Sequence, residues 1–360
     1  MTPRSPAAPT AEQALFAADP PRLTPADAQA IAAQAYGLQG QAQLLTSERD
    51  QNFQLRLDDG RTYVLKATHP AEDPAVTDFQ TQAQLHLMRA GRDLPVPHLH
   101  PTLAGGHVHW HEGPAGMRRA IRLMTFLDGV PLHKVPRSAA QGAALGSALA
   151  SFDLALAGFD HPMADHELLW DLQHADRVAD LLPLIPDGGR RALAERHLAR
   201  FNERLRPALA GLRRQVIHND LNPYNVMVQA HAPDRVAAIL DFGDMVRGPL
   251  AQDLAVACAY RIEAAGDPFA QVLPCVAGYH RMLPLSEPEI AALPDLIAAR
   301  LLITVAITGW RAAQHPGNRA YILRNNGLAW TGLDRLDTLP LAQAQDALFG
   351  ACGAILENPA

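Results

Sequence analysis

Two short motifs in the second half of the chain place acidic and amide side chains at spacings that suit phosphate chemistry. Residues 218–225 read HNDLNPYN, and Asp241 opens the sequence DFG directly after an apolar run. Transfer of a phosphoryl group to a hydroxyl requires a carboxylate that aligns the attacking hydroxyl, and oxygen ligands that hold magnesium. We predict that Asp220 receives the proton of the substrate hydroxyl and that Asn225 and Asp241 bind Mg²⁺.

A lysine far ahead of these motifs completes the pattern. Lys66 ends a strand-like stretch, and the order of strand lysine, hinge, His-x-Asp-x4-Asn, strand and Asp-Phe-Gly is typical of kinases. Each motif alone occurs by chance, and the alternative is a pair of solvated acidic turns. We expect Lys66 to contact the α- and β-phosphates of a nucleotide, and His218 to brace the catalytic loop by a hydrogen bond.

The predicted nucleotide site has further members in the first third of the chain. The loop LTSERDQNF lacks the Gly-x-Gly-x-x-Gly of protein kinases, but its turn formers, Asp50 and Gln51 among them, could expose backbone amides to phosphate. An ordinary polar hairpin turn is the alternative interpretation. The residues assigned to nucleotide binding are Ser47, Asn52, Lys66, Gln80, Met124 and Phe126.

The elements that position these residues begin with a tail and a small predicted lobe. The tail, residues 1–22, mixes Pro, Ala and Thr without apolar periodicity and is expected to be disordered. Residues 23–127 start with a helix bounded by Thr24 and Gly37, and then give the order β-β-β-α-β-β, with the α segment over 74–90. We predict a small antiparallel lobe with one helix that binds the nucleotide.

Residues 128–360 form the second predicted lobe, which is mostly helical, catalytic and substrate-binding. Short apolar, β-branched runs inside it carry the two motifs. The predicted fold class is therefore α+β, with the bilobal architecture of protein kinases. The Ala/Leu-rich segments with helical spacing are 138–158, 171–184, 188–210, 251–265 and 290–315.

The composition excludes several classes of function. A formal net charge of −6 and a pI near 6.2 leave no broad basic footprint for nucleic acid. We find no unbroken apolar run of the roughly 18 residues that a membrane helix needs. The 3 cysteines form no Cys-x-x-Cys pair and the chain shows no secretory signal, so we expect a cytoplasmic protein.

Longer stretches carry a family resemblance. The segments ERDQNFQLRLDDGRTYVLK, VIHNDLNPYNVMV, ILDFGDM and GWRAAQHPGNRAYIL, with others from about Leu23 onward, resemble the aminoglycoside phosphotransferase and choline kinase-like superfamily. Within it they look closest to hydroxylysine kinases and to the phosphotransferase domains joined to class III aminotransferases.

The resemblance implies a small-molecule kinase that uses ATP or GTP with Mg²⁺. Its favoured acceptor is 5-hydroxylysine, and it suggests a functional link to a class III aminotransferase. The alternatives are a kinase of homoserine, choline, ethanolamine or an aminoglycoside, and a pseudokinase-type nucleotide-binding module.

The sequence departs from the family pattern at two positions. The helix of the small lobe has no glutamate to pair with the strand lysine, so Lys66 is expected to rest on a neutral partner such as Gln80. Asn219 stands where glycine often follows the histidine, a change expected to alter the detail of the loop and leave its role unchanged.

A hydroxy amino acid would bring a carboxylate and an ammonium to the pocket, so acidic and basic residues of the second lobe are candidates for binding it. Asp253 is assigned to structure, as a cap at the start of a helix. Trp310 and Tyr321 could equally be core residues. The candidates are Asp244, Arg247, Trp310, Arg311 and Tyr321.

Three histidines alternate along one predicted strand. His107, His109 and His111 would share a face, and three imidazoles can bind zinc. The segment offers no carboxylate to orient the rings, so we interpret it as an exposed polar face and assign no zinc.

Overall fold

The computed structural model describes residues 22–47, 49–90 and 94–356, which form two compact units. The first takes the described residues of Met1–Gly91, Val96–Leu127 and His161–Leu169. The second takes those of Arg92–Pro95, Asp128–Asp160 and Trp170–Ala360. Apart from Arg22, the tail predicted at 1–22 lies outside the described residues.

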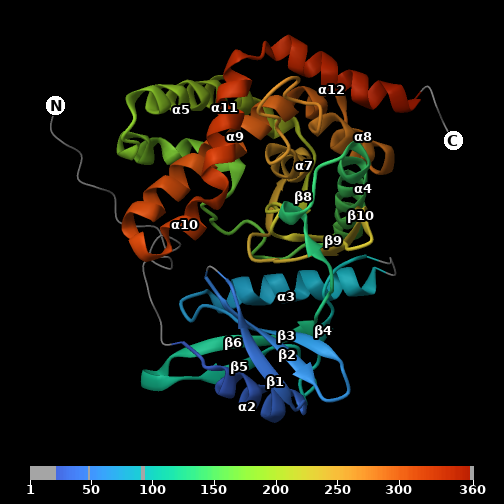
Figure 1. Cartoon of the computed structure of the whole chain (residues 1–360), viewed down its shortest axis with the longest axis vertical. Helices are drawn as coiled ribbons and strands as arrows, with labels where there is room; N and C mark the ends of the chain where they lie inside the picture. The colour runs from blue at the N-terminus through green and yellow to red at the C-terminus, as the bar shows by residue number, and fades with distance from the viewer. Residues whose placement is uncertain (1–21, 48, 91–93, 357–360) are drawn as a thin grey trace. The chain divides into compact units, whose positions relative to one another are not determined.

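The first unit is an antiparallel sheet with a helix on each face (Figure 1). The strands run in the order β1-β2-β3-β6-β4, and β5 pairs with β6. The helices are α2 (Pro25–Tyr36) and α3 (Pro74–Arg89), and a 3₁₀ turn spans Pro114–Gly116. The strands are β1 (Gly40–Leu45), β2 (Gln51–Leu57), β3 (Thr62–Ala67), β4 (Leu99–His100), β5 (His109–Glu112) and β6 (Arg118–Thr125).

Strand alternation explains which side chains meet each helix, because successive residues point to opposite faces. Phe53 and Leu65 pack with Ile31 of α2, whereas Val64 and Met124 pack with Leu85 of α3. The described part of this unit therefore contains both helices expected over residues 23–127. Helix α2, before the first strand, packs on one face of the sheet, and α3, the helix expected among the strands, packs on the other.

Local signals account for the boundaries of α2. Thr24 and Asp27 form a capping box, Pro25 takes the first helical position, and Gly37 ends the helix with φ of 67°. The β2–β3 hairpin pairs Asn52 with Lys66 and turns at Gly60, whose φ is 87°. These elements confirm the predicted helix and hairpin.

The second unit is mostly helical, with two small antiparallel sheets that carry the motifs. One pairs β8 (Arg214–Ile217) with β11 (Val246–Pro249), and the other has the order β10-β9-β7. The strands of the latter are β7 (Val130–Pro131), β9 (Val226–Gln229) and β10 (Ala232–Ile239). The α-helices are α4 (Ala139–Leu156), α5 (Gly188–Arg200), α6 (Arg206–Ala208), α7 (Leu250–Ala259), α8 (Val272–Met282), α9 (Glu287–Gln314), α10 (Arg319–Ile322), α11 (Asn326–Thr338) and α12 (Leu341–Leu356).

Several of these elements differ from the expected ones. Leu172–Leu184 forms 3₁₀ turns with a kink at His174, and the helix predicted over 188–210 passes through a π-helical turn at Phe201–Leu205. The helix expected to reach residue 265 ends at Ala259. Shorter 3₁₀ turns span Leu132–Lys134, Leu209–Gly211, Pro316–Asn318 and Leu323–Asn325. The sequence analysis assigned no helix to α8, α11 or α12.

Helix α8 packs so closely on α4 that two glycines are required. A Cβ atom at Gly146 would overlap the carbonyl oxygen of Cys275, and one at Gly278 would overlap that of Ala143. Small residues let the two backbones touch. Glycine and proline also weaken the helical signal of the sequence, which is why α8 was missed.

Helix α9 is the central helix of the second unit in Figure 1. Of the helices in the described chain, it alone has the length and apolar composition of a membrane span. Within the unit, 89% of its most apolar window is buried, so the rest of the unit provides the apolar environment that this helix requires.

The chain passes from the first unit to the second between Leu127 and Asp128, where the predicted boundary lies, but two short segments group with the other unit. His161 and His166 pack their rings against Phe79 of α3, with centroids 5.5 and 5.8 Å away, so 161–169 groups with the first unit. Pro95 belongs to the second unit, where its carbonyl accepts a hydrogen bond from the amide of Ile239 at 2.7 Å.

Candidate functional site

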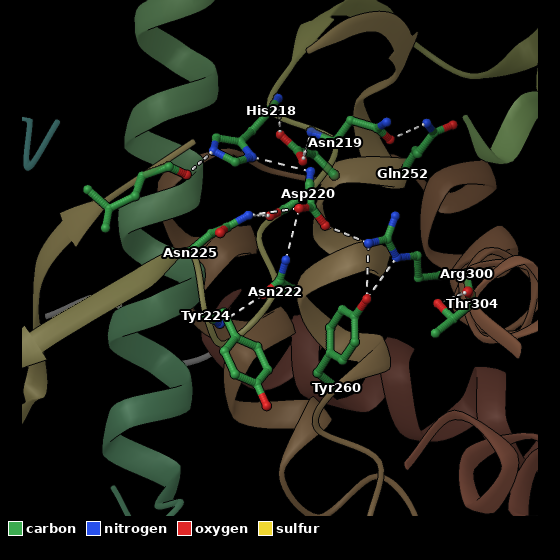
Figure 2. Close-up of polar contacts among 12 residues, drawn as sticks. His218, Asn219, Asp220, Asn222, Tyr224, Asn225, Gln252, Tyr260, Arg300 and Thr304 are labelled. Atoms are coloured by element: carbon green, nitrogen blue, oxygen red, sulfur yellow. Dashed lines mark hydrogen bonds and ion pairs between the residues drawn. The ribbon is translucent and has the colours of Figure 1, made fainter. Parts of the chain in front are cut away.

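The loop that follows β8 holds the carboxylate of Asp220 with three side-chain donors (Figure 2). Asn222 and Asn225 donate to Oδ2 from 2.9 and 2.7 Å. Arg300 of α9 donates from Nη2 to Oδ1 at 2.5 Å. Each carboxylate oxygen has two lone pairs, so these contacts orient Asp220 and still leave it able to accept a proton.

Burial raises the pKa of Asp220 above its ordinary value, although Arg300 and Asn222 act in the opposite direction. A raised pKa makes a carboxylate a stronger base. Ionised Asp220 is therefore both held in one orientation and more basic than an exposed aspartate.

His218 joins the catalytic loop to Leu240, the residue that follows β10. Its Nε2 lies 3.0 Å from the carbonyl oxygen of Leu240, and its Nδ1 accepts from the amide of Asp220 at 3.2 Å. These partners require a neutral ring that donates from Nε2. The imidazole thus serves as a brace within the loop.

The backbone of the same loop is held by a second carboxylate. Asp253 of α7 accepts from the amides of His218 and Asn219, both at 2.8 Å. The prediction that Asp253 caps its own helix was wrong, because it binds the amides of the catalytic loop instead. Burial and the nearby charge of Asp253 raise the pKa of Asp153 far above its ordinary value, so neutral Asp153 can donate to Asp253.

Asn219 adopts φ of 64°, in the left-handed region. Glycine tolerates this region best, and asparagine is among the few other residues that enter it readily. This explains why glycine and asparagine can both follow the histidine.

Asn225 and Asp241 have the donor chemistry that a hard divalent cation takes. The amide nitrogen of Asn225 is committed to the main-chain and side-chain oxygens of Asp220, which leaves its Oδ1 for a metal. Asp241 follows β10 with φ of 63°, a strained conformation that often marks a functional position. Mg²⁺ commonly takes one or two carboxylate ligands and completes its shell with water and phosphate oxygens, so the pair fits it.

In the first unit, Lys66 has a charged partner that the sequence analysis did not assign. Its Nζ lies 3.0 Å from Oδ2 of Asp50, whose Oδ1 accepts from the amide of His69 at 2.9 Å. Burial works to raise the pKa of Asp50, but Lys66 and Arg49 outweigh it and hold that pKa well below its ordinary value. The expectation of a neutral partner was therefore wrong, and Gln80 accepts from Arg122 at 3.0 Å.

The remaining nucleotide candidates occupy different environments. The hydroxyl of Ser47 donates to the carbonyl of Asp50 at 2.5 Å and shapes the loop. Oδ1 of Asn52 is buried and has no hydrogen-bond partner within the described chain. Met124 is a core residue packed on Leu85, and Phe126 is half-buried, with its amide bonded to the carbonyl of Thr62.

The structure separates the predicted substrate residues into two groups. Burial acts to lower the pKa of the Arg300 guanidinium, but Tyr260, Asp220 and the charge of nearby Asp244 outweigh it and raise that pKa. Arg247 forms an ion pair with Asp160. Trp310 and Arg311, by contrast, lie about 15 and 16.5 Å further along α9 than Arg300, from the rise of 1.5 Å per residue.

Tyr321 is linked to the catalytic loop through Arg324. The Arg324 guanidinium lies 3.9 Å from the ring centre of Tyr321 and 4.9 Å from that of Tyr224. Tyr224 in turn stacks on His133, with ring centroids 4.0 Å apart. These cation–π and stacking contacts bring Tyr321, but not Trp310 or Arg311, toward the loop.

Arg300 is the main functional residue that the sequence analysis missed. It is 2% exposed, and it donates from Nε and Nη2 to the hydroxyl of Tyr260 at 3.1 and 3.0 Å. The ring of Trp170 lies 5.1 Å from its guanidinium carbon. A lone arginine in the apolar run LIAARLLITVAI was the available signal, because a buried charge needs partners.

The alternating histidines form no metal site in the structure. His109 and His111 lie on β5 with ring centroids 6.5 Å apart, and His107 precedes the strand. Over residues 22–47, 49–90 and 94–356, no three His, Cys, Asp or Glu side chains are grouped as ligands for one ion.

Comparison with known proteins adds a family and its relatives. Residues 41–285 match the model of the phosphotransferase enzyme family. Hydroxylysine kinase of Mus musculus is 25% identical over 339 residues, which cover 88% of this chain and 90% of that protein. Homoserine kinase of Azorhizobium caulinodans is 30% identical over 264 residues, covering 68% and 73%. Amicoumacin kinase hAmiN, solved with AMP-PNP, Ca²⁺ and Ami, has the same fold, with a TM-score of 0.65 at 14% identity over 87% of this chain and 94% of that one.

Proposed function

This chain belongs to the phosphotransferase enzyme family, and from that premise we propose that it transfers the γ-phosphate of ATP or GTP to the hydroxyl of a hydroxy amino acid or amino alcohol. Our favoured acceptor is 5-hydroxylysine. The observation that carries the proposal is Asp220, oriented by Asn222, Asn225 and Arg300 within hydrogen-bond distance. The relatives named for hydroxylysine and homoserine support an acceptor of the hydroxy amino acid class.

Each residue has a definite part in the proposed reaction. Asp220 accepts the proton of the acceptor hydroxyl as the acceptor oxygen attacks the γ-phosphorus. The bond from that phosphorus to the oxygen bridging the β- and γ-phosphates breaks, and the nucleoside diphosphate leaves. Asn225 and Asp241 hold Mg²⁺, which offsets the charge on the phosphates when it is bound. Lys66, which forms an ion pair with Asp50, binds the α- and β-phosphates.

The direct test is an assay of nucleoside diphosphate release in the presence of Mg²⁺. ATP and GTP are each crossed with 5-hydroxylysine, homoserine, choline, ethanolamine and an aminoglycoside. We expect turnover with 5-hydroxylysine. Preference for homoserine, choline or ethanolamine would overturn 5-hydroxylysine as the acceptor, and preference for the aminoglycoside would contradict the proposed acceptor class; either result would preserve the mechanism.

The competing function is a nucleotide-binding module without catalysis. Thermal stabilisation by nucleotide without turnover of any acceptor would favour it. The argument for such a module was that the small-lobe helix has no glutamate to pair with Lys66. That argument is weaker now, because Asp50 supplies a carboxylate to Lys66. The cytoplasmic location and the link to a class III aminotransferase stay predictions.

A further inference from the structure

We propose that Arg300 binds a carboxylate of the acceptor, so that the enzyme selects hydroxy acids over the corresponding amino alcohols. The inference rests on the proposed function and narrows it. It arises from one buried donor beside the catalytic carboxylate, and every residue involved belongs to the second unit.

Two of the three nitrogens of the Arg300 guanidinium, Nε and Nη2, are held by hydrogen bonds. Nη2 reaches Asp220 at 2.5 Å, and both Nε and Nη2 reach the hydroxyl of Tyr260. The aromatic rings of Trp170 and Tyr260 lie 5.1 and 5.7 Å from its central carbon. Side-chain exposure is 3% for Arg300 and 16% for Asp220, so the pair is well shielded from water.

One donor group of this arginine is left over. Nη1 is buried, and no hydrogen-bond partner for it occurs in the part of the chain that the structure describes. Figure 2 shows this nitrogen directed away from both Asp220 and Tyr260. A buried charged donor without a partner is costly, so a native protein that retains one needs a reason, such as a ligand, an ion or an ordered water that pairs with it.

A carboxylate is the ligand that suits this donor best. The planar guanidinium matches carboxylate oxygens in geometry and charge, and shielding from water strengthens the attraction. The reaction adds a second reason. When Asp220 takes the hydroxyl proton it becomes neutral, and Arg300 loses the charge of that partner. A carboxylate on the acceptor would keep the arginine paired through the transfer.

Position also favours the acceptor as the source of the carboxylate. The guanidinium contacts the residue proposed to receive the acceptor's proton, so an acceptor that binds at Asp220 would lie beside Arg300. Arg311, the other arginine of α9, lies about 16.5 Å further along the helix and is too far away to bind the same carboxylate.

The test compares matched acceptors that differ only in the carboxylate. The pairs are 5-hydroxylysine with its decarboxylated counterpart, and homoserine with 3-aminopropanol. For the wild type we expect kcat/KM to be roughly 10- to 100-fold higher for the acid of each pair, as for a hydrogen bond to a charged group. Arg300→Met should remove most of this preference, Arg300→Lys should retain part of it, and Arg311→Met should leave it unchanged.

The results distinguish an arginine that binds the acceptor's carboxylate from one that only positions Asp220. If Arg300 only orients Asp220, Arg300→Met will lower kcat/KM equally for acid and amino alcohol, and the proposal fails. Should Arg300→Met not fold, the wild-type preference still decides, because equal turnover within each pair also overturns the proposal while leaving the kinase function standing. Nucleotide binding without turnover of any acceptor would instead contradict the proposed function itself.

Discussion

Asp220 illustrates how single side chains are coupled at this site. Its carboxylate balances a buried arginine and accepts from two amides, so the catalytic group is also a structural one. Removing one partner of a buried ion pair leaves the other charge uncompensated. Substitutions at this residue therefore have consequences for both turnover and stability.

We expect Asp220→Asn to lower kcat by roughly 10²–10⁴-fold, since the amide cannot accept the hydroxyl proton. Asp220→Ala should in addition lower the free energy of unfolding by about 3 kcal/mol, because Arg300 loses its charged partner. Turnover assays and denaturant titrations check the two effects. As the control, Asp176→Asn removes the carboxylate of an exposed ion pair with Arg206 and should change neither quantity much. An active Asp220→Asn enzyme would refute the mechanism.

The ion pair between Asp50 and Lys66 gives a second prediction for single residues. Asp50→Asn should raise KM for the nucleotide by about tenfold, because Lys66 loses the carboxylate that orients it. Steady-state kinetics at saturating acceptor measures the change. The matched control is Asp59→Asn, in an exposed ion pair with Arg61 of the same hairpin. Equal KM values for Asp50→Asn and the wild type would show that Asp50 does not position the lysine.

At the scale of elements, the catalytic loop is held between β8, β10 and α7. His218 ties it to Leu240, and Asp253 holds its amides. Further away, α4 and α8 meet at two glycines whose neighbours leave no room for a methyl group. The catalytic loop is therefore positioned by residues outside its own motif, and the helices of this unit depend in turn on close backbone contacts such as that of α4 with α8.

Gly278→Ala should lower the free energy of unfolding by about 1–3 kcal/mol, since the added methyl group meets the backbone of α4 and the helices must separate. The matched control is Gly309→Ala in α9. Its Cβ would meet nothing within 4 Å, so the gain in helix propensity should stabilise the protein by about 0.5–1 kcal/mol. Urea unfolding curves distinguish the two. A neutral Gly278→Ala would show that the close approach is not required.

The elements that the sequence predicted well are those with local signals. The capping box of α2, the turn at Gly60 and the two motifs each depend on neighbours in the chain. Arg300 and Asp253 reach the site only because α9 and α7 pack beside the loop, and no fixed spacing encodes that contact. The partner of Lys66 could not be predicted for a related reason. The family pattern places the pairing carboxylate on the helix of the small lobe, whereas Asp50 lies in the loop before β2.

At the scale of the whole molecule, buried titratable groups make stability depend on pH. His197 of α5 is 3% exposed, and its Nε2 lies 3.0 Å from the carbonyl oxygen of Leu333 in α11. Burial lowers the pKa of His197 to about 4. Between pH 4 and 6.5 the unfolded chain therefore binds a proton that the folded protein does not, so this histidine makes stability rise with pH through that window.

The expected size of the effect is about 3 kcal/mol, lost as the pH falls from 6.5 toward 4. His197→Gln retains a donor for Leu333 but cannot titrate, so its unfolding free energy should depend less on pH than that of the wild type. Unfolding titrations at several pH values measure the difference. The exposed His231→Gln serves as control and should follow the wild type. Parallel curves for the wild type and His197→Gln would contradict the assignment.

Helix α9 carries both the buried centre of the larger unit and the arginine that contacts the catalytic aspartate. A mutation there that alters acceptor choice also disturbs the packing of that core, so natural lineages should change specificity first through less buried positions such as Asp244 and Tyr321. Selection for new acceptors in the laboratory should accordingly begin from a stabilised parent, which stays folded despite the loss of stability that mutations in α9 cause.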